Sequence, residues 1–158
     1  MRILLLLIFL VQSASVLSDI DISNPRALMF AADNKENIID VISIKEEKVI
    51  YQIETEDHVD NLLSTPYAPI LIYTNIENSL LYVYDLKTKK MVKEIVLPIS
   101  PRHMVLDTTG TKIAISDSHK GGFILFSPYA ADIIFYIDDF PQTKDVLFDP
   151  NENEIFYT

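Results

Sequence analysis

Cysteine is missing from the whole chain of 158 residues. Its absence excludes disulfide bonds, zinc sites with thiolate ligands and cysteine nucleophiles. Cysteine usage therefore does not indicate the redox compartment of the protein. Tryptophan is also missing, and glycine occurs only three times. The sequence contains no Gly-rich phosphate loop, no GxSxG nucleophile elbow, no HExxH zinc motif and no CxxCH haem-attachment motif. No motif of the chain therefore specifies a reaction.

Basic residues are scarce, because 13 Lys and Arg stand against 23 Asp and Glu, for a formal net charge of −10. Such a field repels phosphate backbones and anionic lipid surfaces, so nucleic acid is not expected as a partner. Hydrophobic residues make up 49% of the chain and charged residues only 23%, which favours a buried core over disorder. The aromatic residues are eight Tyr and eight Phe, and together with many Ile, Val and Leu they favour strands.

The N-terminus has the pattern of a secretory signal peptide. Arg2 precedes an apolar run at 3–11 and a small polar stretch at 12–15, and cleavage after Ser18 fits. The run is much shorter than the roughly 20 residues that a transmembrane helix needs, so no stable membrane anchor is expected after cleavage. The alternative is a first core strand or helix. We predict a signal peptide at 1–18 and a secreted or periplasmic protein.

The chain repeats itself with a period of 42 residues. The segment 38–44 aligns with 80–86 without a gap, and Ile53, Ile95 and Ile137 are also spaced by one period. A repeat of this length is typical of solenoids and propellers. The register divides the chain after residue 18 into the repeats 19–60, 61–102, 103–144 and an incomplete 145–158.

Each repeat is expected to hold four short strands. In the second repeat they cover 61–65, 70–75, 79–86 and 91–97, and turn-forming residues separate them. In the third repeat Gly110 supplies a position that can adopt a positive φ. Four antiparallel strands in about 40 residues are the signature of a β-propeller blade. The predicted fold is therefore all-β, a β-propeller of four-stranded blades.

The middle strands support blades that stack face to face. Residues 80–84 are apolar at every position, as expected of a strand covered on both faces by neighbouring blades. The chain holds about three and a third such blades, whereas propellers close with at least about four. We therefore expect a fragment of a larger propeller, or one part of a ring that another chain completes.

Five segments of the repeat resemble a known family. Residues 72–75, 79–85, 88–90, 101–105 and 110–116 are similar to the YVTN-type β-propeller repeat. The resemblance covers essentially all of 19–158 and implies a propeller fold. Similar repeats occur in surface-layer proteins, lactonase-like enzymes, the haem-binding propeller of nitrite reductases and the large subunit of quinone-dependent amine dehydrogenases. The resemblance therefore implies no single function.

Candidate binding residues lie where one blade connects to the next, because these loops open at one mouth of the central channel. The loops are 54–60, 97–103 and 138–145, and most of their charges are acidic. The segment with Arg102 and His103 resembles a Pro-Arg-His segment of lactonase-like propellers, where the pair lies near the proposed substrate pocket. Such a pair can orient a carboxylate and move a proton.

The favoured alternative for His103 is an anchoring hydrogen bond at the entry to the inner strand. The residues one period before and after it, Asn61 and Asp145, are also polar. His58 and His119 occupy other places in their repeats, so no shared metal site is predicted.

Two further sets of residues are candidates for contact with a ligand or partner. The first set is acidic, and a calcium ion is one possible ligand for it, although the spacing matches no defined calcium loop and a solvated face is preferred. These residues are Glu56, Asp57, Asp138 and Asp139. The second is Tyr129 in an apolar hairpin tip, a candidate contact patch.

The sequence as a whole favours a secreted or periplasmic propeller that binds or scaffolds a protein partner and has no catalytic centre of its own. No cofactor and no metal are predicted. Partner-binding candidates are His58, Arg102, His103, Tyr129, Asp138 and Asp139. One alternative is a lactonase-like hydrolase that uses Arg102 and His103. Another is a propeller subunit of a periplasmic redox enzyme.

Overall fold

The computed structural model describes residues 24–117, 119–138, 145–149 and 154–157, so the predicted signal peptide lies outside the described residues. One 3-10 turn, η1 (Pro25–Ala27), precedes the strands. The strands are β1 (Leu28–Asp33), β2 (Ile38–Ser43), β3 (Lys48–Glu54), β4 (Asn61–Ser64), β5 (Ile70–Asn75), β6 (Leu80–Asp85), β7 (Lys90–Val96), β8 (Pro101–Leu106), β9 (Ile113–Asp117), β10 (Phe123–Ser127), β11 (Asp132–Ile137), β12 (Val146–Phe148) and β13 (Ile155–Tyr157).

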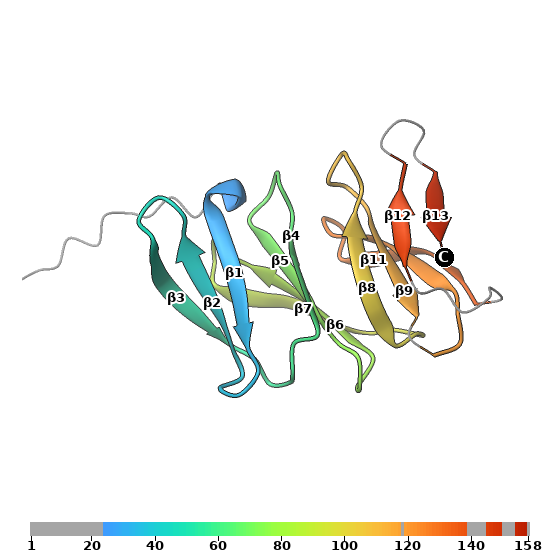
Figure 1. Ribbon diagram of the computed structural model, residues 1–158, viewed down its shortest axis with the longest axis horizontal. Helices are drawn as coiled ribbons and strands as arrows, with labels where there is room; N and C mark the ends of the chain where they lie inside the picture. The colour runs from blue at the N-terminus through green and yellow to red at the C-terminus, as the bar shows by residue number, and fades with distance from the viewer. Residues whose placement is uncertain (1–23, 118, 139–144, 150–153, 158) are drawn as a thin grey trace, which may run out of the picture.

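Consecutive strands pair antiparallel and form four sheets. The sheets are β1-β2-β3, β4-β5-β6-β7, β8-β9-β10-β11 and β12-β13. Figure 1 shows them in a row along the longest axis, with β1–β3 at one end and β12–β13 at the other. Strands β4, β8 and β12 contact one another from sheet to sheet, so they form the inner edge of the row. The prediction of an all-β chain built from four-stranded antiparallel sheets is confirmed.

Irregular backbone features recur along the chain with the same spacing as the sequence. The pairing of the last two strands in each of the first three sheets shifts register, after Val41, after Val83 and after Leu125, and these positions are 42 residues apart. The turn between these two strands ends in a left-handed residue each time, with a φ of 50 to 55°, at Glu47, Lys89 and Ala131. A tight hairpin loop followed by a bulge increases the local twist of the strands.

Two apolar clusters fill the spaces between neighbouring sheets. The first joins Leu28, Ile39 and Val41 of the first sheet to the second sheet. The residues it takes from the second sheet include Leu71, Tyr73, Tyr82 and Tyr84. Because successive side chains of a strand point to opposite faces, the other face of the second sheet is free to contact the third.

The second cluster lies between the second and third sheets. It joins Ile72, Leu81 and Val83 to Ile115 and other residues of the third sheet. Residues 72–73 of β5 and residues 81–84 of β6 are all buried. The predicted burial of residues 80–84 on both faces is confirmed for 81–84, while Leu80 is half-buried.

A capped turn closes the end of β8. Asp107 accepts hydrogen bonds from the backbone N–H groups of Thr111 and Lys112, at 2.7 and 2.9 Å. Gly110 has a φ of 71°, as predicted, and a Cβ there would lie 2.6 Å from Cγ of Pro66 in the second sheet. A side chain at this position would therefore push the two sheets apart. No helix in the part of the chain that the structure describes is long and apolar enough to cross a membrane.

Candidate functional site

The connection between the first two sheets, residues 55–60, is the most heavily hydrogen-bonded loop of the described chain. Asn34, in the turn after β1, holds it from the side of the first sheet. Its Oδ1 accepts a bond from Val59 N–H at 2.9 Å, and its Nδ2 donates to Val59 O at 3.1 Å. One side chain thus satisfies both backbone groups of Val59 and fixes the path of the loop.

The same asparagine contacts the imidazole of His58. Asn34 Nδ2 lies 3.0 Å from Nε2 of the imidazole. Because Asn34 Oδ1 accepts from Val59, its Nδ2 is the donor in this contact, so Nε2 of His58 must accept. This contact therefore favours the neutral tautomer whose ring hydrogen is on Nδ1.

Asp57 ties the loop to the second sheet. Its Oδ2 accepts a hydrogen bond from the Tyr82 hydroxyl at 2.7 Å, and its Oδ1 accepts from Nδ2 of Asn78 at 3.1 Å. The Tyr82 ring stacks on Tyr73 with the centroids 4.7 Å apart. Burial, together with the bond to Asp57, raises the pKa of Tyr82 above its usual value, and burial with nearby Glu56 raises the pKa of Tyr73. Both phenols therefore remain donors well above neutral pH.

A hollow of about 380 Å³ lies beside this loop. It is lined by His58, Asp60, Asn75, Ile76 and Glu77. Asp60 Oδ2 accepts from Ile76 N–H at 2.6 Å, and Asn75 Nδ2 donates to the carbonyl of His58 at 2.9 Å. The loop and the β5–β6 turn are thus bonded to each other around a hollow that carries two exposed carboxylates.

The next connection, residues 97–100, is held differently. Buried Asp117, at the end of β9, accepts bonds from the backbone N–H groups of Ser100, His119 and Lys120 at 2.9 to 3.3 Å. A smaller hollow of about 190 Å³ lies here. The carboxylate thus orders the backbone of the connection, and His119 and Lys120 are the other charged or titratable residues that line this hollow.

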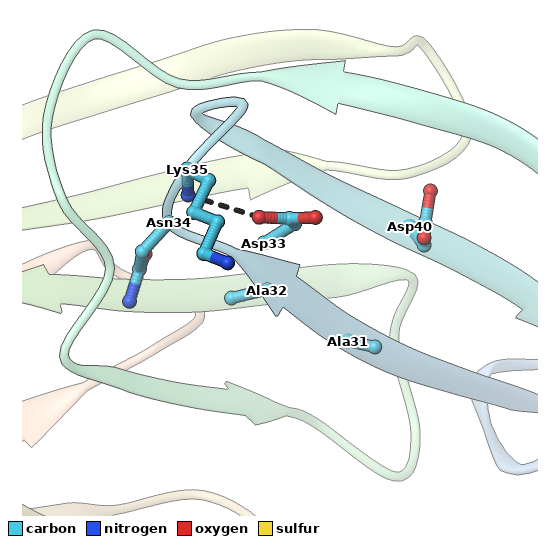
Figure 2. Close-up of a pocket in the computed structure, with 6 residues that line it drawn as sticks. All are labelled: Ala31, Ala32, Asp33, Asn34, Lys35 and Asp40. Carbon is cyan, nitrogen blue, oxygen red and sulfur yellow. Dashed lines mark hydrogen bonds between the residues drawn. The ribbon is translucent and has the colours of Figure 1, made fainter.

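A third hollow, of about 520 Å³, opens at the end of β1 and is shown in Figure 2. Ala31 and Ala32 form its floor, and Asp33 Oδ1 accepts from Lys35 N–H at 2.9 Å in the turn above it. Asn34 belongs to this turn and also holds the 55–60 loop. The hollow is open to solvent and its charged groups are Asp33, Lys35 and Asp40.

Arg102 and His103 do not lie in a loop as predicted, because β8 begins at Pro101. Pro101 pairs with Asp117 and His103 with Ser116, so Arg102 is the extra residue of a β-bulge. A proline is tolerated as the first residue of an edge strand, where no partner needs its N–H. The pair therefore begins the inner strand at the connection end, and both side chains are exposed.

His103 forms a tether to the following sheet. Its Nε2 lies 2.9 Å from Oδ1 of Asp145, and both side chains are 57% exposed. One period earlier, Asn61 donates to the carbonyl of Pro101 at 3.3 Å and to Thr74 Oγ1 at 3.1 Å. Residues at the same place in successive repeats thus link one inner strand to the next, which agrees with the anchoring interpretation of His103.

The remaining candidates are spread over the molecule. Asp138 is exposed directly after β11, and Asp139 lies outside the described residues. Tyr129 is 43% exposed in the turn after β10, at the end of that strand opposite to Asp138. Five strand residues span roughly 16 Å, so Tyr129 and Asp138 do not share a site.

The acidic candidates do not form a metal site in the described ranges, where no group of three or more His, Asp or Glu residues comes together. Asp57 is engaged by Tyr82 and Asn78 instead. The roles of Asn34 and Tyr82 were not predicted. The only signal for them is position, since Asn34 follows a strand end and Tyr82 is a polar-tipped residue in the middle of a strand.

Comparison with known proteins identifies the fold. No protein-family model matches the chain, and no curated protein matches it. Hydrazine synthase from Kuenenia stuttgartiensis superposes with a TM-score of 0.72 and 15% identity, over 83% of this chain and 38% of that chain. Dihydro-heme d1 dehydrogenase NirN in complex with DHE superposes with a TM-score of 0.71 and 12% identity, over 85% of this chain and 30% of that chain.

Both similar structures are β-propeller-type proteins. The chain has a β-propeller fold. Identities this low establish the fold and nothing further. The chain spans well under half the length of either structure that it matches. Membership in the YVTN repeat family stays a prediction, because no family model supports it.

Proposed function

We propose that the chain is a propeller module that binds a protein partner with a basic surface, at the end of the sheets where the 55–60 connection runs. One observation carries this proposal. The connection is fixed to both flanking sheets through Asn34, Asp57 and Asn75, while other side chains of the same region remain exposed. A loop that is ordered before binding loses less conformational entropy when a partner docks.

The exposed side chains indicate the chemistry of the partner. Glu56, Asp60 and Glu77 are exposed around the 55–60 loop. The chain as a whole carries a net charge of −10, so its field attracts cations before contact. A surface rich in Lys and Arg is the natural complement. The predicted signal peptide would place the encounter outside the cytoplasm.

A charge-reversal experiment tests the location of this surface. The probe is a fluorescent peptide of ten lysines, titrated with the chain at two salt concentrations and followed by anisotropy. Glu56→Lys with Glu77→Lys should weaken binding about tenfold or more at low salt, because two attractive charges become repulsive. The effect should shrink as salt screens the field.

The matched control reverses the same number of charges at the opposite ends of the strands. Glu46→Lys with Glu47→Lys lies in the β2–β3 turn, and Lys is compatible with the left-handed backbone at 47 because Lys89 has the same conformation one period later. This control should change binding by less than about threefold. Equal weakening in the two double variants would mean that net charge alone attracts the probe, and it would refute a localised surface.

A second candidate function is the propeller part of a redox enzyme, which the names of the two similar structures favour. His58 and His103 fit a haem poorly as ligands, since Nε2 of His58 bonds Asn34 and Nε2 of His103 bonds Asp145. In this function the redox group would belong to another domain or chain. A visible absorption spectrum of the complex isolated under native conditions tests it, and a spectrum without cofactor bands would count against it.

A further inference from the structure

The hairpin that joins β6 to β7 carries the densest positive charge of the sequence. Four of the seven residues at 87–93 are lysines and none is acidic, in a chain with a net charge of −10. Lys87, Lys89, Lys90 and Lys93 are all exposed. The hairpin lies at the end of the second sheet opposite to the 55–60 connection, because β6 begins at the turn that bonds to that connection. The connection and the hairpin therefore carry opposite charge.

The backbone of the hairpin does not require lysine. The equivalent hairpins of the first and third sheets have the same left-handed backbone, yet Glu47 and Ala131 occupy the place of Lys89. Residues 45–48 of the first sheet carry no net charge, and residues 129–132 of the third hold a single negative charge. Of these three equivalent hairpins, only the one in the second sheet is basic, so its charge is not a property of the repeat.

Protection of a sheet edge explains only part of this charge. Lysines along an outer strand discourage pairing with another chain, and Lys90 and Lys93 of β7 fit that role. Lys87 and Lys89 lie in the turn before the strand, where there is no row of backbone groups to protect. The two lysines of the turn therefore need another explanation.

Two of the lysines have ammonium groups that contacts with neighbouring sheets hold in place. Lys89 Nζ lies over the ring of Tyr51 in the first sheet, 4.4 Å from its centroid. Lys93 Nζ donates a hydrogen bond to Ala131 O of the third sheet at 2.8 Å. A cation that is already ordered loses less conformational entropy when it binds an anion.

No carboxylate of the described chain forms an ion pair with these four lysines. Asp85 lies beside the hairpin at the end of β6. Its Oδ1 accepts hydrogen bonds from the backbone N–H groups of Lys87 and Thr88, at 2.8 and 3.0 Å. Four lysines against this one aspartate leave residues 85–93 with a net charge of +3. The positive charge is therefore available to a partner.

We propose that this hairpin binds an acidic segment of a partner protein, at a surface separate from the one at 55–60. Met91 and Val92 follow Lys90 and are 43% and 57% exposed, so a polypeptide can match apolar as well as basic side chains here. A nucleic acid or an anionic membrane extends beyond the hairpin and meets the acidic remainder of the chain, which repels it. A short acidic segment contacts the lysines alone.

A fluorescent peptide of ten glutamates tests this surface by anisotropy at low salt. Lys87→Glu with Lys90→Glu should weaken binding about tenfold or more, because two attractive charges become repulsive. The effect should shrink as salt screens the charges. Both residues are exposed, so the midpoint of thermal unfolding should stay within about 3 °C of the wild-type value.

Lys45→Glu with Lys48→Glu is the matched control, because it reverses the same number of charges at the equivalent places of the first sheet. It should change binding by less than about threefold. Equal weakening in the two double variants, or no binding of the peptide to the wild-type chain, would overturn the proposal. Tighter binding of a single-stranded DNA of ten nucleotides than of the peptide would also overturn it. The probe for the 55–60 surface has the opposite charge, so either surface can fail its test without the other.

Discussion

The two spaces between the first three sheets are built on the same backbone and filled with different chemistry. Between the first and second sheets, Tyr73 stacks on Tyr82 and Tyr82 bonds to Asp57. One period later the same places hold Ile115 and Ile124, which are fully buried among other apolar residues. An interface that contains tyrosine hydroxyl groups thus lies beside one that is apolar.

The two interfaces therefore have different roles. Aliphatic side chains stabilise by burial and are indifferent to direction, so the second interface holds the sheets together. Tyr82 in the first interface reaches the 55–60 connection through its hydroxyl, and it links sheet packing to the shape of the proposed binding surface. The polar groups also carry a cost, because the Tyr51 hydroxyl is buried without a hydrogen-bond partner among the described residues.

Truncating a side chain in the second, apolar interface should have the largest effect. Phe126 is fully buried in the second cluster, and Phe126→Ala should lower the free energy of unfolding by about 3–5 kcal/mol. Urea denaturation followed by circular dichroism measures it. Tyr67→Ala is the control, since Tyr67 is 65% exposed, and its cost should stay below about 1 kcal/mol. Equal losses would mean that the second cluster does not dominate stability.

Alkali should weaken the first interface selectively. Burial raises the pKa of Tyr73 and of Tyr82, so the folded state keeps protons that the unfolded chain releases near pH 10. Stability is fully present below that pH and falls above it, with a slope of about 1.4 kcal/mol per pH unit for each tyrosine. Tyr73→Phe with Tyr82→Phe should flatten the decline between pH 9 and about pH 11. An unchanged slope in the double variant would place the alkaline sensitivity elsewhere.

Acid should act on the turn that follows β8. Burial alone would raise the pKa of Asp107, but the hydrogen bonds from Thr109, Lys112 and Thr111 outweigh it and hold the pKa below its usual value. The stabilisation is therefore present above about pH 4 and is lost as the pH falls through the lower folded value. Asp107→Asn should cost about 1–3 kcal/mol at pH 7.

The pH dependence of the same variant tests whether the charge of Asp107 stabilises the fold. The difference between wild type and Asp107→Asn should shrink toward pH 3, because the wild-type carboxylate is then increasingly protonated. Thermal unfolding at the two pH values measures it. A difference that is the same at pH 7 and pH 3 would contradict a role for the charge of this residue and leave only its geometry.

The inner-strand tethers should have the smallest effects. His103→Ala removes a contact with Asp145 in which both side chains are 57% exposed, so it should cost about 0.2–1 kcal/mol. Asn61→Ala removes two partly buried hydrogen bonds and should cost about 1–2 kcal/mol. Chemical denaturation of both variants compares the tethers. A larger loss of unfolding free energy from His103→Ala than from Asn61→Ala would contradict the expectation that the exposed contact contributes less than the partly buried one.

Much of the fold could be predicted from the repeat. The strands expected at 70–75 and 79–86 are observed at Ile70–Asn75 and Leu80–Asp85, because apolar and β-branched runs between turn residues specify strands locally. The positive φ of Gly110 was also predicted. The placement of Arg102 and His103 in a loop was wrong, since a proline at the start of an edge strand gives no local sign that pairing has begun.

The candidate site could be located only in part. The sequence indicated that the connection at 54–60 and its acidic residues matter, but it did not join Asp57 to Tyr82 or Asn34 to Val59. Those partners are 25 residues apart, and their contact depends on how two sheets pack. Side-chain hydrogen bonds between sheets leave no periodic signal in the sequence, so no sequence pattern predicts them.

By itself, then, the sequence determined the strands, their turns and the propeller arrangement, because hydrophobic period and turn chemistry act over a few residues and repeat along the chain. Only the tertiary structure decided which polar groups meet, which connection is held rigid, and which apolar positions stay uncovered. Met29 and Leu71 occupy the same place in two repeats, yet one is exposed and the other is buried. The difference comes from the presence of a neighbouring sheet, which local sequence does not encode.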